Sequence, residues 1–139
     1  MLKEILQGLE VPDRKLQEKQ KFMYSIDHCF QVKGQGTVIT GTVLQGKVKV
    51  GDTIEFPQLG LQQKVKSIQM FRKPVNQAHG GDRIGMRIDQ LDAEKLERGI
   101  ATSPGFVQQV DKILVKVQKI GYFTSDIKTK SKFHLTIGH

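Results

Sequence analysis

Two stretches decide the fold of this chain: FMYSIDHCF at residues 22–30 and TVITGTVL at residues 37–44. Larger side chains occupy every second position of the first stretch: Phe22, Tyr24, Ile26, His28 and Phe30. This is the period of a β-strand, in which alternate side chains face opposite sides of the sheet. The second stretch is rich in β-branched residues, which favour strands. Both stretches therefore predict strands of an all-β domain.

Short segments of the same kind continue to residue 103, separated by turn signals such as Gln45-Gly46 and Gly51-Asp52. The further strands are predicted at residues 47–50, 53–56, 64–71, 83–88 and 100–103. Short strands with close turn signals are typical of a closed barrel rather than a parallel sheet. We therefore predict a closed antiparallel β-barrel over residues 21–104.

The segments on either side of the barrel have other patterns. Leu2, Ile5, Leu6 and Leu9 recur at helical spacing, so a short N-terminal helix is expected before Pro12, followed by a polar linker to residue 20. A helical turn is predicted at residues 92–98, ending at Gly99. Beyond Pro104, alternation at residues 113–117 and 133–137 predicts part of a second β-barrel at 105–139. The expected organisation is thus 1–20, 21–104 and 105–139.

The composition describes a soluble, globular chain with a basic excess. Hydrophobic residues make up 37% of it, which suffices for a core, and no apolar run is long enough for a membrane span. The N-terminus lacks a signal-peptide pattern, and the single cysteine fits a reducing, cytoplasmic setting. The net charge of +8 makes an anionic partner plausible, with RNA ahead of a membrane surface. Basic side chains that only keep the surface solvated explain the charge equally well.

No motif in the chain indicates catalysis or metal binding. Gly34, Gly36 and Gly41 have neither the dinucleotide-binding spacing nor that of a P-loop, and they precede a strand, so a tight turn and close backbone approach are expected. The histidines are scattered, and His28 and Cys29 are strand neighbours that should point to opposite faces. An enzyme is therefore the least supported class for this chain.

Residues 70–73, with the sequence MFRK, combine apolar and cationic side chains after a strand. Such a patch can stack on a base and bind a phosphate. In isolation, the simpler interpretation is that Phe71 belongs to the core and that Arg72 and Lys73 form a solvated turn.

Several motifs in order resemble the second domain of translational GTPases of the elongation factor Tu type. They are IDHCF at 26–30, GQGTVITG at 34–41, KVGD at 49–52, MFRK at 70–73, GDRIG at 81–85 and LERG at 96–99. The resemblance covers residues 21–103. Finer features, namely DHCF at 27–30, Gln35, SIQMF at 67–71 and KFHLTIGH at 132–139, are similar to the selenocysteine-specific elongation factors of eukaryotes. The last of these extends the resemblance into the third domain.

The resemblance implies the role of several residues. Val38 would line the pocket for the terminal adenine of a tRNA, and Gln69 and Arg72 would contact that nucleotide or its neighbour. Asp27, His28 and Arg83 would form the pocket for the selenocysteyl group. Asp27 and His28 are sequence neighbours, so both can face one pocket only if the strand bends or bulges there.

The same resemblance implies partners and cofactors. Selenocysteyl-tRNA and the ribosome would be partners, together with an RNA element and its binding protein through the full-length factor, but no membrane. Residues 1–20 would be the last helix of a GTPase domain and a linker. GTP and Mg²⁺ would belong to that GTPase domain, whose nucleotide motifs this chain lacks, so the chain itself is expected to bind no cofactor or metal and to have no catalytic residue.

Two other functions remain open at this point. The barrel could bind RNA in another translational GTPase, such as an initiation factor, in which case deacylated RNA should bind as tightly as the selenocysteyl form. It could also be a spacer between domains, in which case Asp27, His28 and Arg83 should be inert in tRNA-binding assays.

We expect the 139-residue chain not to bind or hydrolyse GTP, because it contains no Gly-x-x-x-x-Gly-Lys-Ser/Thr loop to enclose the phosphates. Titration with a fluorescent guanine nucleotide measures this directly. Saturable binding in the micromolar range would contradict the expectation.

Overall fold

The computed structural model describes residues 19–34, 36–89, 91–92, 96, 98–108, 110–122, 124–132, 134 and 136. The chain divides into two units, Met1–Gln109 and Val110–His139. The predicted helix at residues 2–9 lies outside the described residues, as do most of the predicted helical turn at 92–98 and most of the predicted strand at 133–137. No helix in the described part of the chain is long and apolar enough to cross a membrane.

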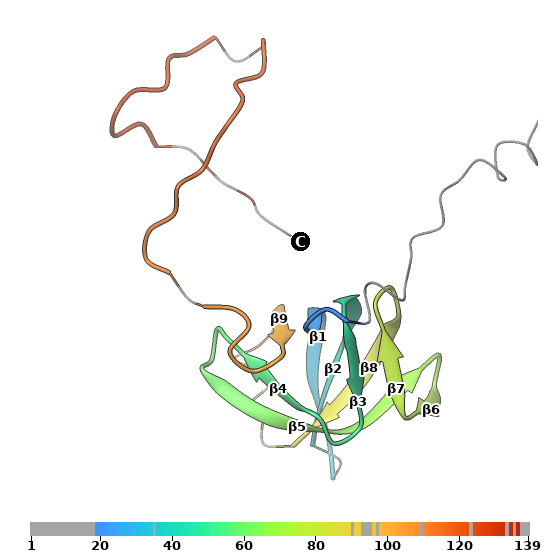
Figure 1. Cartoon of the computed structure of the whole chain (residues 1–139). Coiled ribbons are helices and arrows are strands. Elements are labelled where there is room, and N and C mark those ends of the chain that lie inside the picture. The colour runs from blue at the N-terminus through green and yellow to red at the C-terminus, as the bar shows by residue number, and fades with distance from the viewer. Residues whose placement is uncertain are drawn as a thin grey trace, which may run out of the picture. The chain divides into compact units, whose positions relative to one another are not determined.

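The first unit contains the predicted closed antiparallel barrel (Figure 1). Its wall follows the order β4-β9-β1-β2-β8-β5, and a further pairing of β4 with β5 closes the ring. The strands are β1 (Met23–Val32), β2 (Gly36–Gln45), β4 (Thr53–Phe56), β5 (Leu61–Met70), β8 (Arg83–Ile88) and β9 (Gly99–Thr102). The strands expected in the barrel wall from alternation and β-branched composition are thus confirmed.

Three shorter strands accompany the barrel wall. β3 (Lys47–Lys49) pairs with β7 (Gln77–His79), and β6 (Lys73–Val75) pairs with the end of β5. The sequence analysis missed β6 and β7, because each has only three residues and shows no clear alternation. Pro74 suits β6, since this strand lies at the edge of the sheet, where a missing N–H costs least.

The barrel interior is filled by apolar side chains from all of its wall strands. Tyr24, Ile39, Phe56, Met86 and Ile88 are fully buried. The Tyr24 hydroxyl donates a hydrogen bond of 2.8 Å to the carbonyl oxygen of Ile84, which ties β1 to β8 across the core. Burial of this hydroxyl raises the pKa of Tyr24 far above its ordinary value, so it remains a donor.

A β-bulge at Asp27 interrupts the alternation of β1. Ile26 pairs with Gly41 of β2 and His28 pairs with Thr40, so that Asp27 is an extra residue with no partner of its own. Tyr24 and Ile26 therefore face the core, whereas His28 and Phe30 are exposed on the outer face. The expectation that all five alternating residues share one face is wrong beyond Ile26, because one inserted residue reverses the side to which each following side chain points.

Gly41 makes room for this bulge. A Cβ atom at Gly41 would overlap the carbonyl oxygen of Ser25 and approach the Tyr24 ring to 3.1 Å. The close backbone approach expected for this glycine is therefore present. Gly34 and Gly36 have positive φ angles of 75° and 88° in the β1–β2 hairpin, as expected of glycines in a tight turn.

Two turns of the barrel use the same local chemistry. The Asp52 carboxylate accepts a hydrogen bond from the amide of Lys49, and the Asp82 carboxylate accepts one from the amide of His79. In each turn the glycine before the aspartate has a positive φ angle, 93° at Gly51 and 91° at Gly81. The second turn leads directly into β8 and so sets the position of Arg83 opposite Thr42.

The described residues of the second unit form no strand or helix. The strand predicted at residues 113–117 is not formed, and Ile113, Leu114, Val115 and Val117 are exposed. An isolated strand leaves its backbone donors and acceptors unpaired, and the described part of this unit offers no second strand to pair with them. Alternation alone was therefore not sufficient to predict a strand here.

We expect Gly41→Ala to lower the free energy of unfolding by about 3 kcal/mol, because the new methyl group forces β1 away from β2 at the bulge. Urea denaturation followed by circular dichroism measures this loss. Gly85→Ala is the matched control, since a Cβ there meets its nearest atoms at 3.8–4.0 Å, an ordinary contact. Equal midpoints for the two variants would show that the bulge tolerates a side chain opposite it.

Candidate nucleic-acid interface

A hollow of about 700 Å³ lies on the outer wall of the barrel, over β1, β2, β5 and β8. Its lining combines apolar, polar and cationic side chains: Phe30, Val32, Val38, Thr40, Ser67, Gln69, Phe71, Arg72, Arg83, Ile84, Gly85 and Arg87. The volume is in the range of small-molecule sites.

Strand register brings these residues together from distant parts of the sequence. One row across the wall consists of the paired residues Phe30, Val38, Arg87 and Ser67. The neighbouring row consists of His28, Thr40, Gly85 and Gln69. Because Gly85 has no side chain, the second row is open at its centre, and the hollow reaches the backbone there.

The electrostatic character of the hollow is cationic. Arg72, Arg83 and Arg87 line it, and no carboxylate is among its lining residues. The Nε atom of Arg87 is buried and has no hydrogen-bond partner among the described residues. Guanidinium groups bind phosphate and carboxylate oxygens in a planar, forked geometry.

Asp27 reaches the hollow through Arg83. The Arg83 Nη1 atom lies 2.6 Å from the Asp27 Oδ2 atom, and the Arg83 side chain remains 62% exposed. An exposed pair of this kind contributes little to stability. Its effect is positional, because the carboxylate holds one edge of the guanidinium and leaves its other N–H groups open to the solvent.

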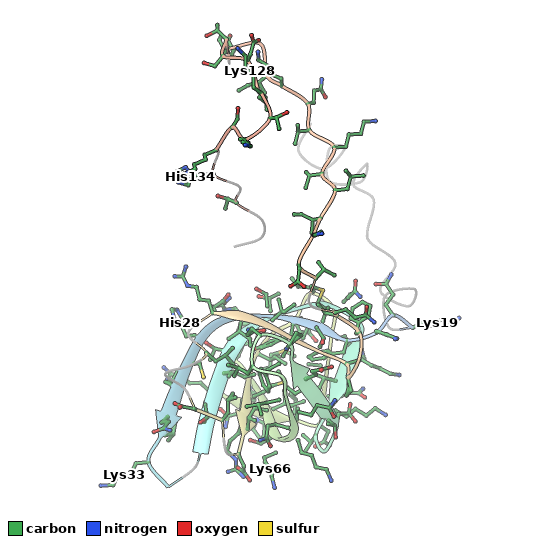
Figure 2. All side chains as sticks on the ribbon, turned by 90° about the vertical axis from the view of Figure 1, so that its left-hand side faces the viewer. Lys19, His28, Lys33, Lys66, Lys128 and His134 are labelled. Carbon is green, nitrogen blue, oxygen red and sulfur yellow. The ribbon has the colours of Figure 1, made fainter. Side chains whose placement is uncertain are left out.

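His28 and Cys29 point to opposite sides of β1, as strand neighbours should. Figure 2 shows His28 on the outside of the barrel wall, and the Cys29 side chain packs against the core. Burial raises the pKa of the Cys29 thiol, and the nearby Asp92 carboxylate raises it further. The two side chains therefore form no nucleophile–base pair.

The structure gathers most of the predicted site residues. Val38, Gln69, Arg72 and Arg83 all line the hollow. Asp27 is bound to Arg83, and His28 lies next to the hollow, paired with Thr40, without being one of its lining residues. The bulge at Asp27 is the irregularity that the sequence analysis required if Asp27 and His28 were to serve one site.

The sequence analysis missed several lining residues. Thr40 lies two residues after Val38 on β2, and Arg87 continues the two-residue spacing of Arg83 and Gly85 on β8. Strand periodicity could therefore have identified both residues. Phe30 belonged to the alternating series of Tyr24 and Ile26, and the bulge places it in the hollow instead of on their face of the sheet. Phe71 was given to the core in the simpler interpretation, but its side chain is exposed.

The described residues form neither a glycine-rich loop that leads into a helix, as in mononucleotide-binding sites, nor a cluster of metal ligands. The glycine-rich run at 34–41 forms the β1–β2 hairpin and is not followed by a helix, as a phosphate-binding loop would be. Within the described ranges, no three histidine, cysteine, aspartate or glutamate side chains come together as metal ligands.

Comparison with known proteins shows which families have similar sequences. Residues 36–100 match the family of elongation factor Tu domain 2, and residues 114–139 match the third domain of the eukaryotic selenocysteine-specific elongation factor. The mouse selenocysteine-specific elongation factor is 49% identical over 118 residues, covering 85% of this chain and 20% of its own length. That of Methanocaldococcus jannaschii is 40% identical over 139 residues, covering 99% of this chain and 29% of its own.

Solved structures agree with these relatives. The translation elongation factor SelB of Methanococcus maripaludis, crystallised with the GTP analogue GppNHp, superposes with a TM-score of 0.65 at 39% identity, over 74% of this chain and 22% of its own. The chain thus spans less than a third of the length of the curated relatives. By its sequence and by the fold of its barrel, the chain belongs to the elongation factor Tu-like family, in the branch of the selenocysteine-specific elongation factors.

Proposed function

We propose that the hollow on the barrel wall binds the aminoacylated 3′ end of selenocysteyl-tRNA. The observation that carries this proposal is its lining, in which an apolar wall, an exposed aromatic ring and three guanidinium groups meet over the open centre at Gly85. An apolar wall accepts the face of a base, an amide such as Gln69 bonds an edge or a ribose hydroxyl, and a guanidinium binds phosphate. Val38, Gln69 and Arg72 take these roles for the terminal nucleotides.

Arg83 is the proposed partner of the selenocysteyl group. A selenol is more acidic than a thiol, whose reference pKa is about 8.5, so it is anionic near neutral pH. Asp27 occupies the Nη1 edge of the Arg83 guanidinium, and the remaining N–H groups of this exposed side chain can receive the selenolate. His28, on the same outer face, supplies a second donor. Asp27 then orients Arg83 and does not itself contact the ligand.

Discrimination against serine follows from the same chemistry. A seryl hydroxyl is neutral and smaller than a selenolate, so it leaves the cationic donors poorly paired.

In the complete factor, we propose that this barrel acts beside a GTPase domain that holds GTP and Mg²⁺ and that it delivers the tRNA to ribosomes at recoded UGA codons in the cytoplasm. The proposed domain boundaries are those expected from the sequence: 1–20 for the last GTPase helix and linker, 21–104 for domain 2, and 105–139 for the start of domain 3. An RNA element and its binding protein act through the complete factor. These roles rest on the family of the chain.

A second function, general binding of RNA 3′ ends in another translation factor, is favoured by one observation. Apart from the pair of Asp27 and Arg83, the lining has no feature specific for selenium. If deacylated and selenocysteyl-tRNA bind with equal affinity, this second function is the correct one.

We expect Arg83→Ala, in a full-length factor that carries this chain, to weaken selenocysteyl-tRNA binding by about tenfold to a hundredfold, because a charge-assisted contact is lost. The loss for seryl-tRNA should be much smaller. Equilibrium binding of both charged tRNAs, measured beside a melting curve, separates a lost contact from lost stability.

Two matched variants sharpen this experiment. Arg83→Lys keeps the charge without the planar fork, so partial rescue would show that charge dominates. Asp27→Asn removes only the orienting carboxylate and should cost less than Arg83→Ala. If Arg83→Ala weakens both tRNAs by the same factor, Arg83 is not the selenolate partner.

A further inference from the structure

The turn between β5 and β6 has an unusual backbone for its sequence. Met70 pairs with Lys73, so Phe71 and Arg72 form a two-residue hairpin loop, and both have positive φ angles, 50° and 65°. Two consecutive positive φ angles define a turn that strongly favours Asn-Gly, because a Cβ atom crowds the backbone in the left-handed region. An aromatic side chain at the first of these positions is strained.

The rest of the barrel avoids this strain. At the other described positions of the barrel with positive φ, the residue is a glycine, as at Gly34, Gly46, Gly51 and Gly81. Phe71 and Arg72 are the non-glycine residues with positive φ in the described part of the barrel. The chain therefore places two large side chains where glycine or asparagine would be more stable.

Packing does not account for this choice. The Phe71 residue is 86% exposed, so its ring gains almost nothing from burial in the core. Both Phe71 and Arg72 nevertheless line the hollow described above. An exposed aromatic ring held at the rim of a cationic hollow is the arrangement on which unpaired nucleobases stack.

We propose that the strained β5–β6 turn holds Phe71 as a stacking platform for an unpaired nucleobase, while Arg72 binds the adjoining phosphate. The inference rests on the proposed function of the hollow and adds to it a role for Phe71 and for the strained turn that holds this residue. RNA is favoured over a protein partner because Arg72, Arg83 and Arg87 line the hollow together and no carboxylate does.

Stability and binding should change in opposite directions when Phe71 is replaced. Phe71→Asn relieves the left-handed strain, and we expect it to raise the melting temperature of the 139-residue chain by about 2–6 °C. Phe71→Leu keeps both the strain and the apolar bulk, so its melting temperature should stay within about 1 °C of the wild type. An unchanged or lower melting temperature for Phe71→Asn would overturn the strain argument.

Binding is measured with an RNA minihelix that ends in the unpaired nucleotides ACCA. We expect Phe71→Asn and Phe71→Leu to weaken binding by roughly five- to a hundredfold and Phe71→Tyr to retain it, because only an aromatic face stacks on a base. Leu61→Asn is the matched control, since Leu61 is an exposed apolar residue of β5, the strand that leads into this turn, and does not line the hollow. This control should bind like the wild type.

Abasic minihelices identify the stacked base. Each of the four unpaired bases is removed in turn, and at one position the difference between wild type and Phe71→Leu should disappear. A difference that persists with every abasic RNA overturns stacking, as does a wild-type chain that leaves the minihelix unbound at about 100 µM. Neither result bears on Arg83, whose role is tested separately by comparing selenocysteyl- and seryl-tRNA binding. Failure of stacking on Phe71 can therefore be distinguished from failure of the proposed selenocysteyl pocket.

Discussion

The one-residue bulge at Asp27, held against Gly41, is the constraint on which the functional face of the barrel depends. Before the bulge, Tyr24 and Ile26 fill the core, and after it the phase reverses so that His28 and Phe30 face outward. Next to the bulge, Gly41 leaves room for the Ser25 carbonyl to approach the backbone of β2, which a Cβ atom would block. A core contact and a surface site are thus set by the same local irregularity.

The closed wall explains why such a site can be rigid. Six strands pair in a ring, so each lining residue of β1, β2, β5 and β8 is positioned by hydrogen bonds on a neighbouring strand rather than by a loop. The interior is packed with apolar side chains, and the Tyr24 hydroxyl ties two of the four site strands together from inside. Side chains on the outer face can then be chosen for chemistry, because the inner face alone supplies the core.

The cationic side chains of the hollow also belong to the outer face of the barrel. Arg72 comes from the β5–β6 turn and Arg83 and Arg87 from β8, yet all three line one surface. Among the described residues that line the hollow, Arg83 is the cation that forms an ion pair with a carboxylate, and its partner is the bulged residue Asp27. The backbone irregularity of β1 therefore also decides which of the three cations is oriented.

Much of this architecture could be read from the amino-acid order. Alternation and β-branched content predicted the six wall strands, because one buried face imposes a period of two on every strand. Glycine and aspartate predicted the turns at Gly51-Asp52 and His79–Asp82, since backbone sterics and short-range hydrogen bonds are local. Four of the predicted binding residues, Val38, Gln69, Arg72 and Arg83, were named from a resemblance, and they do lie around one hollow.

Other features required the tertiary structure. The outward position of Phe30 and the pairing of Asp27 with Arg83 depend on a bulge that one strand's sequence does not reveal, because a bulge is defined by the register of the partner strand. The strained turn at Phe71 and Arg72 is likewise imposed by the pairing of Met70 with Lys73. In the second unit, the alternation at residues 113–117 formed no strand, because a strand needs a hydrogen-bonding neighbour and sequence periodicity does not supply one. The amino-acid order alone determined the positions of the barrel strands and turns, because these depend on periodicity and on local backbone chemistry. The closed sheet decided which residues of different strands lie next to one another, because this depends on strand register.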